Sequence, residues 1–351
     1  MEYIFEDVLE IKNGKNQKAV ENSEGQYPIY GSGGVMGYAD DYICDADTVI
    51  IGRKGSINNP IYVTERFWNV DTAFGLSAKR ELLLPRYLFY FCKKFDFEKL
   101  NKTVTIPSLN KSDLLKIKID LPMISEQQDV VARLSKIEAV IELRKQELSA
   151  LDDLIKARFV EMFGDRYVND KNWNTMKLGD SISFNNGKAH EQVVDENGEY
   201  ILVTSRAIAS DFKDVRRTNE LLFPLHKNDI VMVMSDVPNG KALAKCELIN
   251  ENDKYTLNQR ICSFDNYNYN PVFLLFLLSR HPYFLSFNDG NGQTNLRKND
   301  ILDCELIDPP VGLQRQFADF VHQVDKSKVA VQKALKETQV LFDSLMQQYF
   351  G

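Results

Sequence analysis

The sequence predicts an α+β protein: two mixed α/β domains separated by two long helices that form an antiparallel coiled coil, with a pseudo-two-fold internal repeat. Three observations predict this fold class. The second half of the chain repeats the first, each copy ends in a long stretch with helical hydrophobic periodicity, and the rest of each copy mixes β-rich runs with apolar helical segments. A repeat of this length builds two similar units rather than a short-period solenoid.

The repeat is clearest at the end of each copy. Residues 109–115 (LNKSDLL) align with residues 296–302 (LRKNDIL) at an offset of 187, which holds without a gap to Phe163-Gly164 and Phe350-Gly351. About ten of these 56 positions are identical, where roughly three are expected by chance. The openings, residues 7–15 and 180–188, align at an offset of 173, so the middle of the second copy is longer by 14 residues. The frame is therefore repeated, whereas the contents differ.

Four segments follow from this repeat and from a length that suits two or three domains. We expect a first domain at residues 1–122, a central helix at 123–164, a second domain at 165–308 and a C-terminal helix at 309–351. Runs rich in β-branched residues predict short strands at residues 48–51, 61–64, 200–203 and 230–234. Apolar runs that begin beside a proline predict buried helices at residues 84–92 and 271–278.

The long helices each carry a hydrophobic stripe with alternating spacings of four and three, which is typical of a coiled coil. The first stripe is Val130, Leu134, Ile137, Ile141, Leu148, Leu151 and Ile155, interrupted at Arg144. The second is Phe317, Val321, Val324, Val331, Leu335, Phe342 and Leu345, interrupted at Lys328 and Thr338. We expect the two helices to pair antiparallel; the alternative is that each packs only on its own domain.

The ends of the first long helix have their own signals. Ser125 with Gln128 predicts a capping box just after Pro122, and Gly164 predicts the stop. About 40 residues correspond to roughly 60 Å of helix. A second stripe on this helix either packs against its own domain or forms a docking face for another protein's helices; it consists of Val140, Leu143, Ala150, Leu154 and Ala157.

Composition excludes several classes of protein. The five cysteines are odd in number, scattered and without a C-x-x-C pair, which indicates reduced thiols in the cytoplasm rather than disulfides or a zinc site. The N-terminus has no signal-peptide pattern, and the most apolar stretch, residues 271–278, is too short to span a membrane. The net charge of −7 argues against a strongly basic nucleic-acid binder. DNA binding would need local basic clusters or a more basic partner.

Motifs of catalysis fail on inspection. The glycine-rich residues 31–37 match no phosphate-binding pattern. Asp308-Pro309-Pro310-Val311 lacks the aromatic residue of a methyltransferase D-P-P-[YF] loop and lies where a turn leads into the second long helix. Hydrolase, metalloprotease and nuclease signatures do not occur, so we expect a non-catalytic chain without a cofactor or metal of its own.

Polar and basic loops remain at matched places in the two copies. Arginine suits guanine, asparagine and glutamine suit adenine, and serine, threonine and lysine suit phosphates. In the first copy the candidate DNA-binding residues are Arg53, Lys54, Ser56, Asn58, Thr105, Ser108 and Lys111. In the second copy they are Ser205, Arg206, Arg216, Arg217, Lys241, Asn258, Arg260, Gln293, Asn295 and Arg297.

Over its whole length the chain resembles the specificity subunits of type I restriction–modification systems. The resemblance lies in the F/L-x-D-x₆-G-K openings (residues 5–15 and 178–188), in residues 27–34 (YPIYGSGG), and in residues 108–114 leading to 121–127 (LPMISEQ). The degenerate second copy of the last segment is residues 309–314 (PPVGLQ), in which Leu313 replaces the family's usual glutamate. This departure predicts a looser start of the second long helix.

The resemblance implies a cytoplasmic, non-catalytic subunit with two target-recognition domains, one for each half of a split double-stranded DNA site. It also implies two modification subunits, which bring S-adenosylmethionine, and restriction subunits that use ATP and Mg²⁺. The alternative is a DNA-mimic or scaffold protein that occupies a restriction complex, which an acidic chain would suit. A type II enzyme fused to a specificity module would need catalytic motifs that the sequence lacks.

Overall fold

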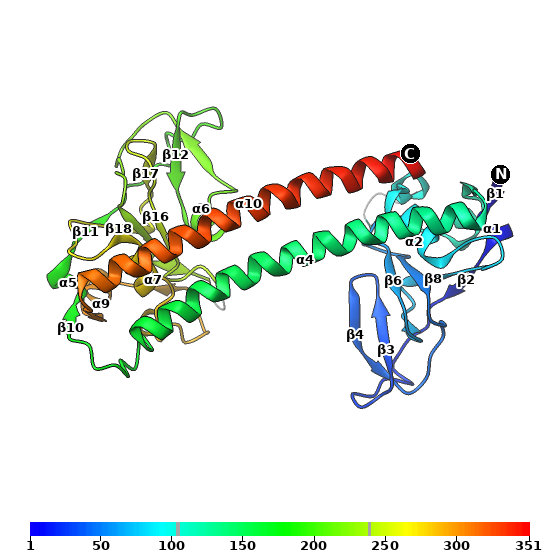
Figure 1. Ribbon diagram of the computed structural model, residues 1–351, viewed down its shortest axis with the longest axis horizontal. Helices are drawn as coiled ribbons and strands as arrows, with labels where there is room; N and C mark the ends of the chain where they lie inside the picture. The colour runs from blue at the N-terminus through cyan, green and yellow to red at the C-terminus, as the bar shows by residue number, and fades with distance from the viewer. Residues whose placement is uncertain (103–105, 238–239) are drawn as a thin grey trace. The chain divides into compact units, whose positions relative to one another are not determined.

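The computed structural model describes residues 1–102, 106–237 and 240–351, which form two compact units (Figure 1). Unit 1 comprises Met1–Gln146 and Val331–Gly351, and unit 2 comprises Glu147–Ala330. The long helices are α4 (Ile124–Phe163) and α10 (Val311–Phe350), each 40 residues long as the periodicity predicts. Each unit thus holds one globular domain, the start of one long helix and the end of the other.

The domain of unit 1 is built on a four-stranded antiparallel sheet in the order β2-β8-β5-β6 and a three-stranded sheet in the order β4-β3-β7, in which β3 and β7 run parallel. Strand β1 pairs with β9. The elements of the domain are β1 (Glu2–Ile4), α1 (Phe5–Val8), β2 (Leu9–Asn13), β3 (Tyr27–Gly31), β4 (Gly34–Ala39), β5 (Thr48–Gly52), β6 (Ile61–Val63), β7 (Trp68–Asn69), β8 (Ala73–Ala78), α2 (Pro85–Lys94), the 3₁₀ helix η1 (Phe97–Leu100), α3 (Lys111–Leu114) and β9 (Lys118–Asp120).

The domain of unit 2 repeats this topology with sheets in the order β11-β18-β14-β16 and β13-β12-β17, and with β10 paired to β20. A further small sheet joins β15 to β19. Its elements are β10 (Thr175–Lys177), α5 (Leu178–Ser181), β11 (Ser183–Asn186), β12 (Tyr200–Val203), α6 (Ser205–Ala209), β13 (Arg216–Thr218), β14 (Ile230–Val233), β15 (Ser235–Asp236), β16 (Cys246–Leu248), β17 (Tyr255–Leu257), β18 (Ile261–Asp265), α7 (Pro271–Leu278), α8 (Pro282–Leu285), β19 (Thr294–Asn295), α9 (Lys298–Leu302) and β20 (Glu305–Ile307).

The additional residues of the second copy fall into several connections between strands. Tyr27 pairs with Ala39 in unit 1, and Tyr200 pairs with Thr218 in unit 2, so the offset grows from 173 to 179 across the turn that carries α6. It reaches 188 at Ala73 and Ile261, the first residues of β8 and β18. Between these points the offset is 181 at Gly52 and Val233 and 186 at Tyr62 and Leu248. The insertions therefore lie in successive loops, and the sheets keep their strand order.

The two long helices pair antiparallel, as the heptad pattern predicts, so the predicted fold class is confirmed. In unit 1 the start of α4 shares a hydrophobic cluster with the end of α10, through Leu134, Ile141 and Phe342. In unit 2 the end of α4 packs in the same way on the start of α10, through Phe159 and Phe317.

Polar pairs across the helix seam occupy the positions where the hydrophobic stripes are interrupted. The Arg144 guanidinium donates to the carbonyl oxygen of Ala334 and to Thr338 Oγ1, both on α10. The Lys328 ammonium donates to Asp152 Oδ1 on α4 at 2.6 Å. The interruptions in the stripes therefore still join one helix to the other.

The start of α4 differs from the predicted capping box. The helix begins at Ile124, so the cap residue is Met123, whose backbone N–H donates to Glu126 Oε2 at 3.1 Å. The prediction of Ser125 with Gln128 is wrong by two residues, because the helix begins one half-turn earlier, where Met123 and Glu126 form only the half of a capping box in which the N3 carboxylate accepts from the N-cap N–H. At α10 the residue that matches Glu126 is Leu313, so this carboxylate is missing.

A buried glutamine joins the start of each long helix to its domain. Gln127 is fully buried; its Oε1 accepts from the Leu84 N–H at the start of α2, and its Nε2 donates to the carbonyls of Leu82 and Pro122. Gln314 does the same in unit 2: its Oε1 accepts from Asn270 N–H at the start of α7, and its Nε2 donates to Pro309. Each glutamine therefore ties a short buried helix to a long one.

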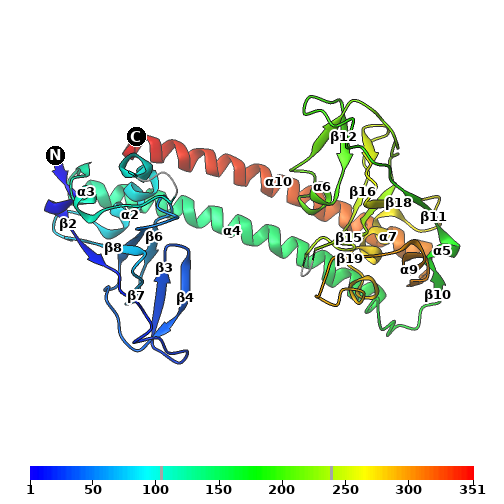
Figure 2. The same cartoon turned by 180° about the vertical axis from the view of Figure 1, so that it is seen from behind.

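An aromatic pair joins the same short helix to the end of the other long helix. In unit 1 the rings of Tyr87 on α2 and Phe350 at the end of α10 are 4.9 Å apart. In unit 2 the rings of Phe273 on α7 and Phe163 at the end of α4 are 4.8 Å apart, and α7 lies beside α10 in both views (Figures 1 and 2). Together with the glutamines, these contacts explain why each unit contains parts of both helices.

The second stripe of α4 is exposed, which excludes packing against its own domain. Val140, Leu143 and Leu154 are 39%, 63% and 47% exposed.

All five cysteines are buried free thiols. Among the helices that the structure describes, none is both long and apolar enough to cross a membrane.

We expect Gln127→Leu to lower the free energy of unfolding of unit 1 by about 2–4 kcal/mol, because a buried polar group without a partner costs about 1–3 kcal/mol. Hydrogen exchange should show faster opening of the Leu84 amide, and Gln128→Leu, at an exposed neighbouring position, should leave it unchanged. A Leu84 amide that stays fully protected in Gln127→Leu would contradict this role.

Candidate nucleic-acid interface

In unit 1 several of the predicted residues lie beside the turn between β7 and β8. The backbone N–H groups of Arg53 and Lys54 donate to the Thr72 carbonyl at 2.8 and 3.3 Å. The Arg53 carbonyl accepts from Leu109 N–H at 2.9 Å, and Lys54 forms a β-bridge with Ser108. The loop after β5 and the loop before α3 therefore meet, which brings Arg53, Lys54 and Ser108 together.

Unit 2 repeats this arrangement with different side chains. Met234 occupies the place of Arg53: its N–H donates to the Arg260 carbonyl at 3.3 Å, and its carbonyl accepts from Leu296 N–H at 2.8 Å. Strand β15 then pairs with β19, with Ser235 opposite Asn295. Arg260 and Asn295 are thereby brought together, and Gln293 and Arg297 flank β19. We call this set of backbone hydrogen bonds, through Thr72 and Leu109 in unit 1 and through Arg260 and Leu296 in unit 2, the backbone frame. It presents Arg53-Lys54 in one unit and Met234-Ser235 in the other.

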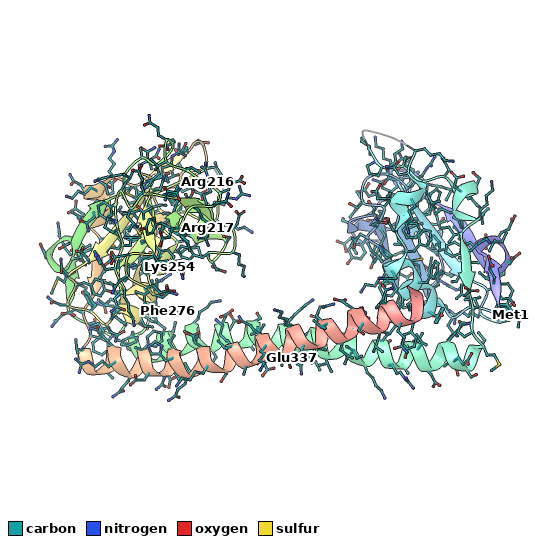
Figure 3. The ribbon with its side chains drawn as sticks, turned by 90° about the horizontal axis from the view of Figure 1, so that it is seen from above. Met1, Arg216, Arg217, Lys254, Phe276 and Glu337 are labelled. Carbon is teal, nitrogen blue, oxygen red and sulfur yellow. The ribbon has the colours of Figure 1, made fainter. Side chains whose placement is uncertain are left out.

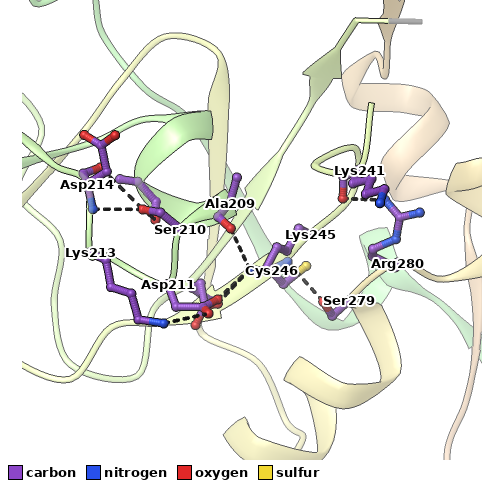
Figure 4. A network of polar contacts seen from close by, with 12 residues as sticks. Ala209, Ser210, Asp211, Lys213, Asp214, Lys241, Lys245, Cys246, Ser279 and Arg280 are labelled. Carbon is purple, nitrogen blue, oxygen red and sulfur yellow. Dashed lines mark hydrogen bonds and ion pairs between the residues drawn. The ribbon is translucent and has the colours of Figure 1, made fainter. Parts of the chain in front are cut away.

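The insertion that carries α6 is fixed next to this frame in unit 2. Thr204 Oγ1 caps α6 by accepting from Ala207 N–H at 3.1 Å. Lys245 holds the following loop by donating to Asp211 Oδ1 at 2.6 Å and to the Ala209 carbonyl at 3.4 Å (Figure 4). Asn258 N–H donates to the Val203 carbonyl at 3.2 Å, so Asn258 lies beside the start of α6 and Ser205.

The loop that carries Lys241 is organised by one carboxylate. Asp236 Oδ2 accepts from the N–H groups of Ala242 and Leu243 at 2.7 and 3.1 Å. Arg280, at the end of α7, donates to the Lys241 carbonyl at 2.6 Å (Figure 4). The backbone of Lys241 is therefore held while its side chain is exposed.

Several predicted residues bind other groups of the protein through their polar atoms. Asn58 Oδ1 accepts from Phe97 N–H at 2.7 Å, and Asn58 Nδ2 donates to Asp96 Oδ1 at 3.1 Å. The Lys111 ammonium donates to the Ile11 carbonyl at 2.6 Å. Arg206 forms an ion pair with Asp214 at 2.6 Å, and Arg217 donates to the carbonyls of Gly198 and Glu199. These contacts give Asn58, Lys111 and Arg217 a structural role, whereas the ion pair of Arg206 is exposed to solvent.

Other predicted residues have exposed polar ends. Among the described residues, the side chains of Lys54, Arg216, Lys241 and Arg260 are exposed and make no hydrogen bond or ion pair with the protein. Arg53 and Ser56 are also exposed, although Arg53 Nη1 lies 3.5 Å from the Asp71 carbonyl. Figure 3 shows Arg216 and Arg217 on the part of unit 2 far from α10, whereas Phe276 lies next to the helix. Thr105 lies outside the described residues.

Two titratable groups of unit 2 with shifted pKa values, Glu247 and His281, lie near Arg166, just after the end of α4, rather than in these loops. Burial raises the pKa of Glu247 to about 7, and Lys245 opposes that shift. Burial, with the nearby Arg166 charge, lowers the pKa of His281 to about 4. Glu247 and Arg166 line a cavity of about 510 Å³ together with Phe159 and Phe276. Arg166 donates to the carbonyls at the end of α7, so this region holds α7 in place.

Lys15 and Lys188 are surface lysines that the loop inspection of the sequence did not select. Each directly follows a glycine at the end of β2 or β11 and is exposed. Lys188 forms a β-bridge with Asn258, beside the predicted Arg260. The signal that marks both lysines is the Gly-Lys pair that closes the two repeated openings.

Comparisons with known proteins agree with this arrangement. The sequence profile of type I restriction modification DNA specificity domains matches residues 2–152 and 170–339. The MjaIX specificity subunit of Methanocaldococcus jannaschii is 21% identical over 84% of this chain and 73% of its own length. The EcoDI specificity subunit of Escherichia coli is 22% identical over 43% of this chain, and the chain spans only 34% of that relative.

Solved structures show the same fold. The S subunit of a type I restriction-modification system from M. genitalium has a TM-score of 0.62 at 16% identity, covering 100% of this chain and 96% of its own. A second similar chain comes from a structure titled for complex assembly and conformational transition of the type I R-M system. Its TM-score is 0.60 at 14% identity, and the match covers 100% of this chain and 97% of that chain.

We expect Asn58→Ala to lower the free energy of unfolding of unit 1 by about 1–3 kcal/mol, since the buried amide of Phe97 loses its acceptor. Lys54→Ala should change it by less than about 0.5 kcal/mol, because the side chain is exposed. Urea unfolding followed by the fluorescence of Trp68 in a Trp173→Phe background reports on unit 1, as the chain has two tryptophans. Equal stability losses in the two variants would contradict the division between structural and free loop residues.

Proposed function

This chain belongs to the family of type I restriction modification DNA specificity domains, and we propose that it is the non-catalytic DNA-specificity subunit of a type I restriction–modification enzyme. In this proposal each domain recognises one half of a split double-stranded DNA site. The chain supplies sequence recognition, and partner subunits supply S-adenosylmethionine, ATP and Mg²⁺ chemistry.

One observation carries the proposal: the same backbone frame occurs in both units and presents different side chains. The carbonyls of Thr72 and Arg260 accept equivalent hydrogen bonds, yet the donors are Arg53 and Lys54 in unit 1 and Met234 in unit 2. Base edges in the major groove are distinguished by the donors and acceptors that face them. Two equal frames with unequal side chains suit two half-sites of different sequence.

Exposed apolar residues on the long helices support the docking of two modification subunits. Leu154 on α4 and Leu341 on α10 are equivalent positions at the offset of 187, and they are 47% and 51% exposed. Leu143 and Val329 add exposed apolar surface, at 63% and 64%. Exposed apolar residues on a helix suit contact with a partner protein, and a pseudo-two-fold repeat offers such positions twice.

The charge of the chain also favours partner-assisted DNA binding. A net charge of −7 weakens attraction to phosphates, which supplies most non-specific affinity for DNA. Exposed Lys54, Lys241 and Arg260 are single cations rather than a broad basic surface. We therefore infer that the modification subunits add much of the phosphate contact.

The purified chain should bind DNA weakly, and the complex with its modification subunits should bind one sequence specifically. Electrophoretic mobility shifts at moderate salt, with and without the partner, measure this difference. Equal sequence-specific affinity in both samples would contradict the partner requirement, and no specific binding by the complex would contradict the proposed function. As a control for a DNA mimic, the chain should not displace DNA from an unrelated restriction complex.

A further inference from the structure

Resting on the proposed function, we infer that Lys15 and Lys188 are matched phosphate-contacting residues, one in each recognition domain, that set the position of each domain on the DNA backbone. Both lysines close the repeated openings, where Gly14-Lys15 and Gly187-Lys188 align at an offset of 173. Neither belongs to the loops that differ between the copies.

The glycine before each lysine lets the backbone approach the following turn closely. A Cβ atom on Gly14 would collide with the Val70 carbonyl, and one on Gly187 would collide with the Asn258 carbonyl. Gly14 N–H donates to Ala73 at 3.3 Å, and Gly187 N–H donates to Ile261 at 3.2 Å. Only glycine fits such a contact, so the same approach is built into both units.

The backbone of each lysine is then fixed at its N–H group. Lys15 N–H donates to the Asn69 carbonyl at 2.8 Å, and Lys188 N–H donates to the Leu257 carbonyl at 3.0 Å. These acceptors begin the turns β7–β8 and β17–β18, the same turns whose later carbonyls hold Arg53 and Met234. Each lysine and the loop that carries Arg53 or Met234 therefore bind opposite ends of one turn.

The carbonyl of each lysine is fixed as well, but by unrelated side chains. Trp68 Nε1 donates to the Lys15 carbonyl at 3.0 Å. In unit 2, His190 Nδ1 donates to the Lys188 carbonyl at 2.7 Å, and its other ring nitrogen bonds Thr256 Oγ1 at 2.9 Å. Trp68 and His190 come from different parts of the frame. The two units therefore hold the lysine backbone at the same position, although a tryptophan binds its carbonyl in unit 1 and a histidine in unit 2.

The chemistry of these two lysine side chains favours an anionic ligand. Both are exposed and make no hydrogen bond or ion pair with a described residue. With the backbone fixed from both sides and the ammonium without a described partner, the cation can reach only the surface around one fixed point of each domain. For a domain that reads DNA, the matching anion is a backbone phosphate, which positions without specifying sequence.

The test is the salt dependence of DNA binding by the complex of this chain with its modification subunits. Lys15→Ala and Lys188→Ala should each reduce the slope of log K against log salt by about 0.9, the value for one phosphate contact. The double variant should lose about twice as much. Lys15→Arg and Lys188→Arg should keep the slope, and the ratio of specific to non-specific affinity should stay constant throughout.

Matched controls come from the far ends of the same sheets. Lys116 lies beside α1, at the other end of β2 from Lys15, and Lys227 precedes the start of β14; both are exposed. Lys116→Ala and Lys227→Ala should leave the slope unchanged. An unchanged slope in the Lys15 and Lys188 variants would overturn the inference, as would a change of sequence preference. A wild-type complex without sequence-specific binding would instead overturn the proposed function.

Discussion

The buried hydrogen bonds of Gln127 and Gln314 are the interaction on which the rest of this structure depends. Each glutamine joins the first turn of a long helix to the N-terminus of a short helix in the domain core. The same short helix contacts the end of the opposite long helix, through Tyr87 with Phe350 and Phe273 with Phe163. Because helix starts and ends meet in each unit, the helices must run antiparallel, and each domain is anchored on both.

This anchoring separates the parts of each domain that must stay constant from those that are free to vary. The Gly-Lys pairs and the β7–β8 and β17–β18 turns form the same backbone hydrogen bonds twice, and the two glutamines form matching side-chain hydrogen bonds. The insertions of unit 2, including α6, lie in loops and leave the strand order unchanged. Since backbone hydrogen bonds hold the frame, loop side chains such as those of Lys54 and Arg260 can change without loss of the fold. We propose that this freedom is what allows two half-sites to differ.

The sequence predicted the elements whose signal is local and repeated. The stripes from Val130 to Ile155 and from Phe317 to Leu345 predict the helices, because hydrophobic periodicity reflects the buried seam directly. The repeat was predictable, but the contacts between the loops of each unit were not, since they use backbone carbonyls that carry no side-chain signature. The sequence also does not show which polar loop residues are available to bind DNA. Asn58 and Lys54 are polar residues of the same loop, yet Asn58 forms hydrogen bonds with Phe97 and Asp96, whereas the Lys54 side chain has no described partner. The capping box was misplaced because Ser125 with Gln128 and Met123 with Glu126 share one spacing.

The central claim, that two equal frames read two different half-sites, is tested most directly by sequencing the methylated positions in DNA of a host that carries this chain and its modification subunits. The account predicts one bipartite motif with two dissimilar halves around an unread spacer. Lys54→Ala should relax only one half and Arg260→Ala only the other, since they belong to separate units. A continuous motif, or one in which either variant alters both halves equally, would contradict it.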